Sequence, residues 1–172
     1  MDKIRTLVID PPWLEKGGGK IKRGADKHYA LLDTAGIIRT ALQGPFMEYE
    51  IEKDAHLYLW VTNNFLPEGL KVITALGFRY KTNVAWIKNR MGLGQYFRGK
   101  HELCLFGTRG KGVAPRTDDR SIPSIIQADI TGHSRKPDAF YEMVERRSNG
   151  PYLDVFARGS REGWAVWGDE AE

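Results

Sequence analysis

The residues with the clearest chemical potential form a tetrad near the start of the chain, Asp10-Pro11-Pro12-Trp13. The tetrad follows an apolar run at 4–9 that predicts a buried strand, and two prolines cannot continue a central strand. An ionised aspartate accepts hydrogen bonds, and each proline has a carbonyl but no N–H. The turn is therefore predicted to present acceptors in a rigid array, with Trp13 adding a broad apolar face at its mouth.

An array of acceptors suits an amino group attached to a heteroaromatic ring. Such an amine is a poor nucleophile, because its lone pair is delocalised into the ring. If Asp10 and the carbonyl of Pro11 each accept one N–H, the nitrogen becomes more tetrahedral and its lone pair can point at a methyl donor. The tetrad would then supply orientation and stabilise the positive charge that develops on nitrogen. For the tetrad alone, a strand-ending turn with a capping aspartate is the alternative.

The elements that must position the tetrad alternate between strands and helices. Apolar runs predict strands at 4–9, 56–61, 78–87, 102–106, 125–130, 152–157 and 164–167. Helices are predicted from Thr34 towards Met47 with Asp33 as cap, at 67–76 and at 137–147. The alternation predicts an α/β layered fold with a mainly parallel sheet, whose last two strands form an antiparallel hairpin.

Ligands of open α/β sheets bind outside the carboxyl ends of the strands, which is where the tetrad is predicted to lie. Two basic loops are expected to flank it and to hold phosphates on either side of a substrate. The basic residues are Lys16, Lys20, Lys22, Arg23 and Lys27 in the first loop, and Arg109, Lys111, Arg116 and Arg120 in the second. A third loop is predicted at 88–100.

Composition limits the class of protein. The chain has 172 residues, enough for one domain spanning 1–172, and a net charge of +4, which suits a polyanionic partner. No apolar stretch approaches a membrane span and no signal-peptide pattern is present. The single cysteine, Cys104, cannot form an internal disulfide, so a reducing cytoplasm is expected. The four histidines are scattered without metal-ligand spacing, so no metal site is predicted.

The tetrad and the segments after it resemble the MT-A70 family of S-adenosylmethionine-dependent adenine-N6 methyltransferases, in the form of a compact bacterial or phage-type member. The resemblance extends from Val8 to Glu170 and keeps the family's order and approximate spacing. The segments that carry it are 10–13, 57–62, 85–88, 99–105, 133–138, 154–158 and 163–168.

The resemblance implies a Rossmann-like, three-layer methyltransferase fold of circularly permuted order, with the catalytic motif first and the cofactor half last. It makes Asp10, Pro11, Pro12 and Trp13 the catalytic residues. It implies that Lys136 pairs with the carboxylate of S-adenosylmethionine and that Asp169 and Glu170 reach its ribose hydroxyls. The other residues implied at the cofactor are Ile9, Asp10, Arg158, Ser160 and Arg161.

The implied substrate is an adenine that is single-stranded or flipped out of a duplex, because its N6 is otherwise paired. Tyr29 and Trp86 are the candidates to stack on it or to line its edge. The remaining residues expected to bind substrate are Lys20, Lys22, Arg23, His133 and Ser134.

The expected activity is methyl transfer from S-adenosylmethionine to adenine N6, with DNA favoured over RNA. RNA as substrate and cytosine N4 as acceptor remain alternatives, because the same tetrad chemistry would serve each. A non-catalytic nucleic-acid-binding partner of an active methyltransferase is a third. Members of the family function in pairs, so the resemblance also implies a homodimer or a heterodimer with a related subunit. No membrane association is expected.

Overall fold

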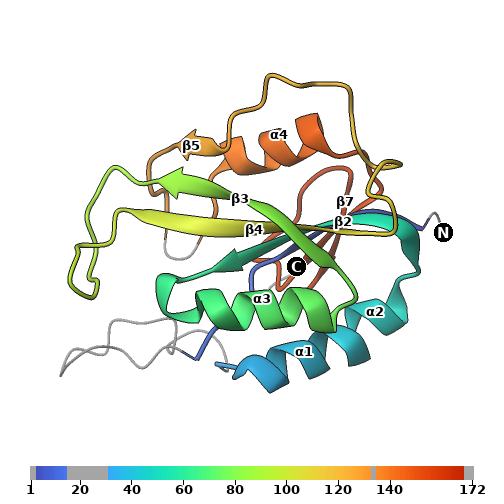
Figure 1. The fold of residues 1–172 in the computed structure, drawn as a ribbon, viewed down its shortest axis with the longest axis horizontal. Coiled ribbons are helices and arrows are strands. Elements are labelled where there is room, and N and C mark those ends of the chain that lie inside the picture. Colours follow the sequence, from blue (N-terminus) through green and yellow to red (C-terminus); the bar gives the residue numbers. More distant parts are fainter. Residues whose placement is uncertain (1–2, 15–30, 133–134, 169–172) are drawn as a thin grey trace.

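The computed structural model describes residues 3–14, 31–132 and 135–168. Within these ranges one mixed sheet of seven strands has the order β5-β3-β4-β2-β1-β6-β7 (Figure 1). The strands are β1 Ile4–Ile9, β2 Ile51–Val61, β3 Arg79–Ile87, β4 His101–Arg109, β5 Ile125–Gln127, β6 Tyr152–Val155 and β7 Trp164–Trp167.

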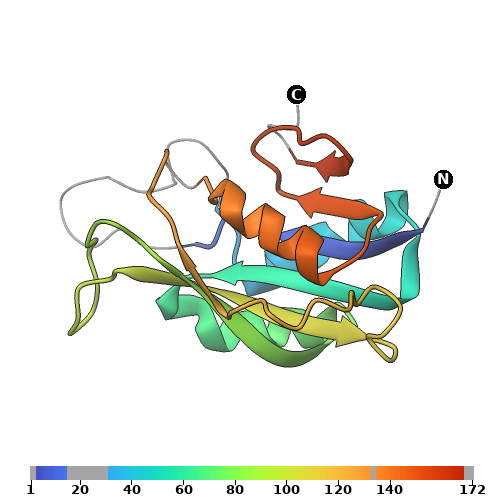
Figure 2. The ribbon, with the colours of Figure 1, turned by 90° about the horizontal axis from the view of Figure 1, so that it is seen from above.

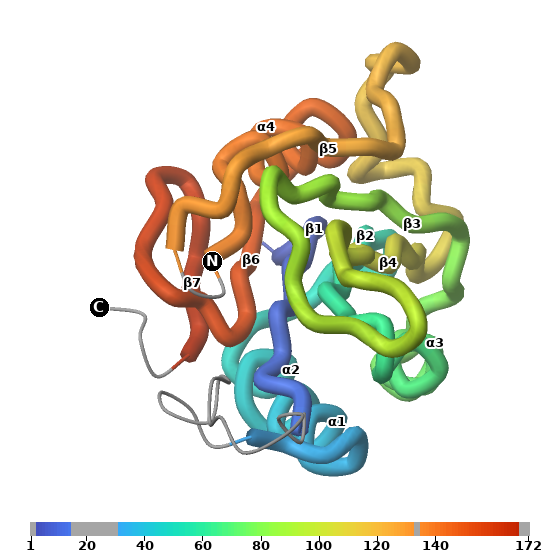
Figure 3. Tube along the Cα trace, turned by 90° about the vertical axis from the view of Figure 1, so that its left-hand side faces the viewer, coloured from blue at the N-terminus to red at the C-terminus, as the bar shows by residue number. Residues whose placement is uncertain are grey.

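Helices cover both faces of the sheet, which gives three layers (Figures 2 and 3). One face carries α1 Thr34–Gln43, α2 Pro45–Glu48 and α3 Leu66–Ala75, the last preceded by the 3-10 turn η2 Asn63–Phe65. The other face carries α4 Asp138–Arg147. Asp33 caps α1 as predicted, because its side chain accepts the backbone N–H of Gly36 at 2.7 Å. Among the described helices, none has the length and apolarity that crossing a bilayer requires.

Strand β2 shows how the sequence divides the core between the two faces. Side chains alternate across a strand, so Leu57 and Leu59 point one way and Tyr58 and Trp60 the other. The first pair joins an aliphatic cluster beneath α1 and α3. The second pair joins an aromatic cluster in which Phe140 of α4 contacts Trp60 at 4.7 Å between ring centroids. Both layers therefore hold β1, the strand that ends at the tetrad, in the interior.

The sheet is mainly parallel and the fold is of the α/β class, as predicted. Strand β1 pairs in parallel with β2 and β6, and β3 pairs in parallel with β5. Strand β4 runs against both of its neighbours, β2 and β3. The antiparallel strand therefore lies inside the sheet rather than at its end.

The predicted antiparallel C-terminal hairpin is wrong. Strands β6 and β7 pair in parallel, with Tyr152 opposite Trp164 and Val155 opposite Trp167. Each strand has only four residues, so the segment 156–163 is long enough to return along the strand before β7 begins. Backbone N–H groups of Phe156 and Ala157 donate to the carbonyl of Trp167, which holds the ends of both strands together at one edge.

Candidate active site

The tetrad lies at the carboxyl edge of the parallel strands, where it leaves β1 and is held on both sides by backbone hydrogen bonds. The N–H of Asp10 donates to Val155 at the end of β6. The carbonyl of Pro12 accepts the N–H of Leu32, and the carbonyl of Pro11 accepts that of Trp13 at 2.9 Å. Each carbonyl oxygen has a second lone pair that these backbone hydrogen bonds leave unused.

Trp13 does not form the exposed apolar face that was expected at the mouth of the site. Its side chain is 6% exposed and stacks on Phe65 with 5.3 Å between ring centroids. Its indole N–H donates to the carbonyl of Trp60 at 3.0 Å. A large ring with one donor is buried where that donor finds a partner, and here it anchors the turn to β2 and η2.

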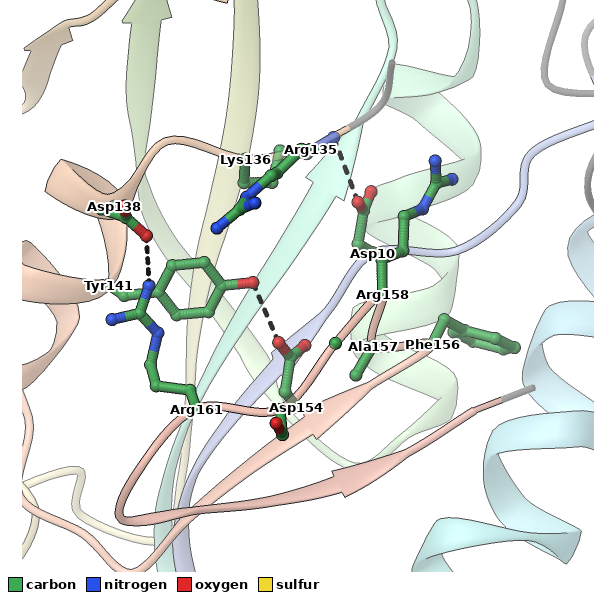
Figure 4. A pocket seen from close by; sticks show the side chains of 12 residues that line it. Asp10, Arg135, Lys136, Asp138, Tyr141, Asp154, Phe156, Ala157, Arg158 and Arg161 are labelled. Atoms are coloured by element: carbon green, nitrogen blue, oxygen red, sulfur yellow. Dashed lines mark hydrogen bonds and ion pairs between the residues drawn. The ribbon is translucent and has the colours of Figure 1, made fainter. Parts of the chain in front are cut away.

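Four charged side chains form a chain of ion pairs that begins at the tetrad. Asp10 lies 3.1 Å from the ammonium of Lys136, which lies 3.5 Å from Glu102. Glu102 in turn accepts from Lys88 at 2.8 Å. Lys136 comes from the segment just before α4, and its ion pair with Asp10 is drawn in Figure 4. Glu102 comes from the start of β4, so the antiparallel direction of β4 is what brings it to this edge.

Burial and neighbouring charges set the protonation of this chain. Burial raises the pKa of Asp10, and the ammonium of Lys136 opposes that rise. For Lys136, burial alone would lower the pKa, but Asp10 and Glu102 together more than offset it, so its pKa is raised. Lys136 therefore stays charged and supplies the positive charge that an ionised Asp10 needs in a desolvated position.

A cavity of about 230 Å³ opens beside Asp10 and Lys136 (Figure 4). Its wall combines the end of β6, the segment after it and the start of α4. The lining residues are Asp10, Arg135, Lys136, Asp138, Tyr141, Asp154, Phe156, Ala157, Arg158, Gly159, Ser160 and Arg161.

The far wall of the cavity is built around Asp154. Tyr141 of α4 donates its hydroxyl to Asp154 at 2.9 Å, and burial raises the pKa of Asp154 to about 7. Arg161 pairs with Asp138 at 2.5 Å and lies over the Tyr141 ring. These contacts fasten the 156–163 segment to α4, so the cavity has walls of both charges.

Comparison with known proteins agrees with this geometry. The sequence model of the MT-A70 family matches residues 4–170. The chain belongs to the MT-A70 family. It is 29% identical, over 99% of its length, to a probable N(6)-adenosine-methyltransferase MT-A70-like protein of Oryza sativa subsp. japonica. It is 26% identical, over its whole length, to the N(6)-adenosine-methyltransferase catalytic subunit METTL3 of Homo sapiens.

A further relative of this MT-A70 chain is the type II methyltransferase M.MunI of Mycoplasma sp, which is 28% identical over 98% of the chain. The chain covers 78% of M.MunI but only 23% of the rice protein and 29% of the human one. It therefore spans less than a third of the length of those two larger relatives.

The MT-A70 chain brings part of its expected cofactor set together. Lys136, Arg158, Ser160 and Arg161 line the same cavity as Asp10. The side chain of Ile9 is fully buried in the core, so only its backbone borders the tetrad. Other expected residues, including the whole first basic loop, lie outside the described ranges: Lys16, Lys20, Lys22, Arg23, Lys27, Tyr29, His133, Ser134, Asp169 and Glu170.

Trp86 does not occupy the position expected of a residue that stacks on adenine. It is 2% exposed and meets Trp60 edge to face at 6.2 Å between ring centroids. Its N–H donates to the carbonyl of Ala128 at 2.8 Å. Its ring is thus part of the aromatic core, and Lys88 covers it at 4.9 Å.

The second basic loop does not flank the tetrad. Because β4 is antiparallel, its last residue, Arg109, lies opposite Ala55, near the amino end of the parallel strands. Arg109 donates there to the carbonyls of Ile51 and Glu52. The loop that carries Lys111 and Arg116 starts from that end (Figure 1), so the sheet separates it from the site.

The residues missed by sequence reasoning are Lys88, Glu102, Tyr141 and Asp154. An acidic residue inside an apolar strand was the available signal for Asp154. Glu102 carried no such signal, because its position depends on the direction of β4. In the described parts of the chain, no group of three or more His, Cys, Asp or Glu side chains is placed to hold a metal ion.

Proposed function

We propose that this protein transfers a methyl group from S-adenosylmethionine to the N6 of an adenine in nucleic acid, with DNA as the favoured polymer. The observation that carries the proposal is the partly buried carboxylate of Asp10 at the cavity, which lies 3.1 Å from the ammonium of Lys136. MT-A70 membership supports the reaction, and the names of two relatives specify N(6)-adenosine as what those proteins methylate.

The cavity suits the amino-acid end of S-adenosylmethionine. That end is zwitterionic, and the cavity wall offers Lys136 to its carboxylate and Asp154 to its ammonium. An ammonium has three donors, of which Lys136 directs two to Asp10 and Glu102, so a third can serve a ligand. When bound, the cofactor supplies an electrophilic methyl group on its sulfonium.

The tetrad orients the amine that receives the methyl group. Asp10 and the second lone pair of the Pro11 carbonyl would each accept one N–H of the adenine amino group. This directs the nitrogen lone pair out of the ring plane and stabilises the positive charge that grows as the N–C bond forms. One N6 proton must then leave, and burial has already raised the pKa of Asp10, which makes it a better proton acceptor.

DNA is favoured over RNA because of how much of each relative's length this chain covers. This chain covers 78% of a type II methyltransferase and less than a third of the relatives named for adenosine in rice and human. A fungal relative named as an N6-methyladenosine RNA methyltransferase, from Cryphonectria parasitica, is matched over 50% of its length, so RNA stays in the test.

The test is transfer of labelled methyl from S-adenosylmethionine to single- and double-stranded DNA and RNA, with nucleoside analysis of the product. We expect N6-methyladenine in DNA and its loss in Asp10→Asn and Asp10→Ala, which should keep their fold. Asp118→Asn is the matched control, because Asp118 is exposed on the loop at the other end of the sheet.

Each other outcome assigns a different activity. N6-methyladenine in RNA alone would make RNA the substrate instead of DNA. N4-methylcytosine would make cytosine N4 the acceptor of the methyl group instead of adenine N6. Full activity in Asp10→Ala would refute the mechanism. Binding of nucleic acid without any transfer would point to the non-catalytic partner.

A further inference from the structure

The loop between β3 and β4, residues 88–100, projects from the edge of the sheet that carries the tetrad (Figures 1 and 3). Backbone hydrogen bonds join its two arms, from Lys88 to Lys100 at 2.8 Å and from Gly92 to Gly99 at 2.6 Å. The guanidinium of Arg98 also donates to the carbonyl of Gly92 at 2.8 Å. The loop is thus a projection held in shape by its own hydrogen bonds, and we call residues 88–100 the β3–β4 finger.

Glycines let the tip of the β3–β4 finger close tightly. A Cβ on Gly94 would lie 2.1 Å from the carbonyl oxygen of Phe97, and a Cβ on Gly99 would lie 2.8 Å from that of Leu93. Tyr96 at the tip has φ 58, in the left-handed region that bulky residues rarely adopt. The turn therefore holds its aromatic residues outward instead of folding them onto the sheet.

The tip of the finger is apolar and unusually exposed. Tyr96 is 103% exposed and Phe97 85%, with Leu93 and Met91 also exposed beside them. Aromatic side chains normally bury most of their surface, so two adjacent exposed rings indicate a binding surface.

The charge of the finger indicates which partner it binds. The arms carry Lys88, Arg90, Arg98 and Lys100, and residues 88–100 contain no Asp or Glu. Exposed rings between cations fit single-stranded nucleic acid, where bases stack on the rings and cations contact phosphates. Protein interfaces are depleted in Lys, whereas the arms of the finger carry Lys88 and Lys100.

The base of the finger is coupled to the candidate active site. Lys88 pairs with Glu102, which faces Lys136, the partner of Asp10. The finger therefore rises from the same edge of the sheet as the tetrad, which is where a strand that delivers an adenine to Asp10 must approach. Extruding that adenine leaves its neighbours unstacked, and a ring can replace the lost stacking.

We propose that Tyr96 and Phe97 form a stacking site for the bases that flank the adenine in single-stranded or locally opened nucleic acid. This inference rests on the proposed function for the identity of the central base, but its binding step does not require methyl transfer.

The test measures binding of fluorescein-labelled oligonucleotides of mixed sequence, as single-stranded DNA, duplex DNA and single-stranded RNA, by anisotropy over a range of salt concentrations. We expect Tyr96→Ala/Phe97→Ala to weaken binding to single strands by about tenfold or more, because each stacked base contributes on that scale. The dependence of affinity on salt should not change, since no phosphate contact is removed. Arg90→Ala should instead reduce the salt dependence.

Tyr80→Ala is the matched control, because Tyr80 is an aromatic residue, 42% exposed, near the start of β3 at the other end of the sheet. It should bind like the unmodified protein. Wild-type affinity in the double variant, in a protein that still methylates, would overturn this inference alone. Wild-type affinity together with a lower mass in light scattering would overturn it in favour of a protein contact.

The proposed function fails separately from the stacking site. If the unmodified protein transfers no methyl group but the double variant still loses binding, the result supports the stacking site and refutes the proposed reaction. If the unmodified protein binds none of the oligonucleotides, both fall.

Discussion

The ammonium of Lys136 lies 3.1 Å from the carboxylate of Asp10, although the two residues are far apart in the sequence. Lys136 is buried and the side chain of Asp10 is 17% exposed, and Glu102 lies on the other side of Lys136 as a second carboxylate. The position of the carboxylate that we propose to be catalytic is therefore set by the segment that leads into α4 as much as by the tetrad.

Lys136→Met should lower the free energy of unfolding and abolish methyl transfer. Breaking one partner out of a buried ion pair typically costs about 3–5 kcal/mol, because the other charge is left uncompensated. We expect a lower free energy of unfolding in urea denaturation and no detectable methyl transfer. The double variant Asp10→Asn/Lys136→Met should regain much of the stability without regaining activity; a double variant no more stable than Lys136→Met would contradict the pairing.

Trp13→Phe should separate positioning from chemistry. The smaller ring can still stack on Phe65 but cannot donate to the carbonyl of Trp60. Loss of one buried hydrogen bond that leaves its acceptor unpaired costs about 1–3 kcal/mol. We expect that loss in thermal unfolding and a decrease in kcat larger than any change in the KM for the cofactor. A change confined to KM would instead place Trp13 at the cofactor.

Asp154 should make stability depend on pH. Burial raises its pKa from 3.8 to about 7, so over that interval the folded protein keeps a proton that the unfolded chain releases. Its contribution to the free energy of unfolding therefore falls as pH rises from about 4 to about 7, by roughly 1 kcal/mol per pH unit. Asp154→Asn should be the more stable protein at pH 8, and the difference should shrink towards pH 4. A gap of constant size would refute the shifted pKa.

The same group should make cofactor affinity depend on pH. Asp154 faces Tyr141 and Arg161, with Asp10 and Lys136 across the cavity. If its carboxylate holds the cofactor ammonium, S-adenosylmethionine should bind more weakly as pH falls below about 7. Calorimetric titration at several pH values measures this, and Asp154→Asn should bind weakly with no such dependence. A pH-dependent Asn variant would assign the titration to another group.

Ser148 should matter for stability and not for catalysis. It is fully buried at the end of the sheet opposite the tetrad, 2.7 Å from both His56 Nδ1 and the Tyr58 hydroxyl. The carbonyl of Gly112 requires a proton on His56 Nε2, so Ser148 donates to Nδ1 and accepts from Tyr58. Ser148→Ala should lower the free energy of unfolding by about 2 kcal/mol or more and leave kcat unchanged. The control is Ser124→Ala, because Ser124 is exposed. An equal decrease in the free energy of unfolding in both variants would contradict a stabilising role for the hydrogen bonds of Ser148.

Local patterns in the sequence were enough to predict most of the elements and the position of Asp10 at the end of a buried strand. The alternation of Leu57 and Leu59 with Tyr58 and Trp60 appears in the structure as two core layers. The cap at Asp33 and the turn after Ile9 likewise depend on adjacent residues. These predictions succeeded because side-chain period, capping and proline geometry act within a few residues.

Strand direction and side-chain partners were decided only by the tertiary structure. A run such as 101–109 forms a strand in either direction, yet its antiparallel pairing brings Glu102 to Lys136 and places Arg109 at the far end of the sheet. Trp86 is apolar enough for a core or a substrate platform, and the contact with Trp60 decided for the core. The sequence by itself determined which groups could do the chemistry. Their arrangement came from pairing and packing between distant segments, whose energies no local pattern contains.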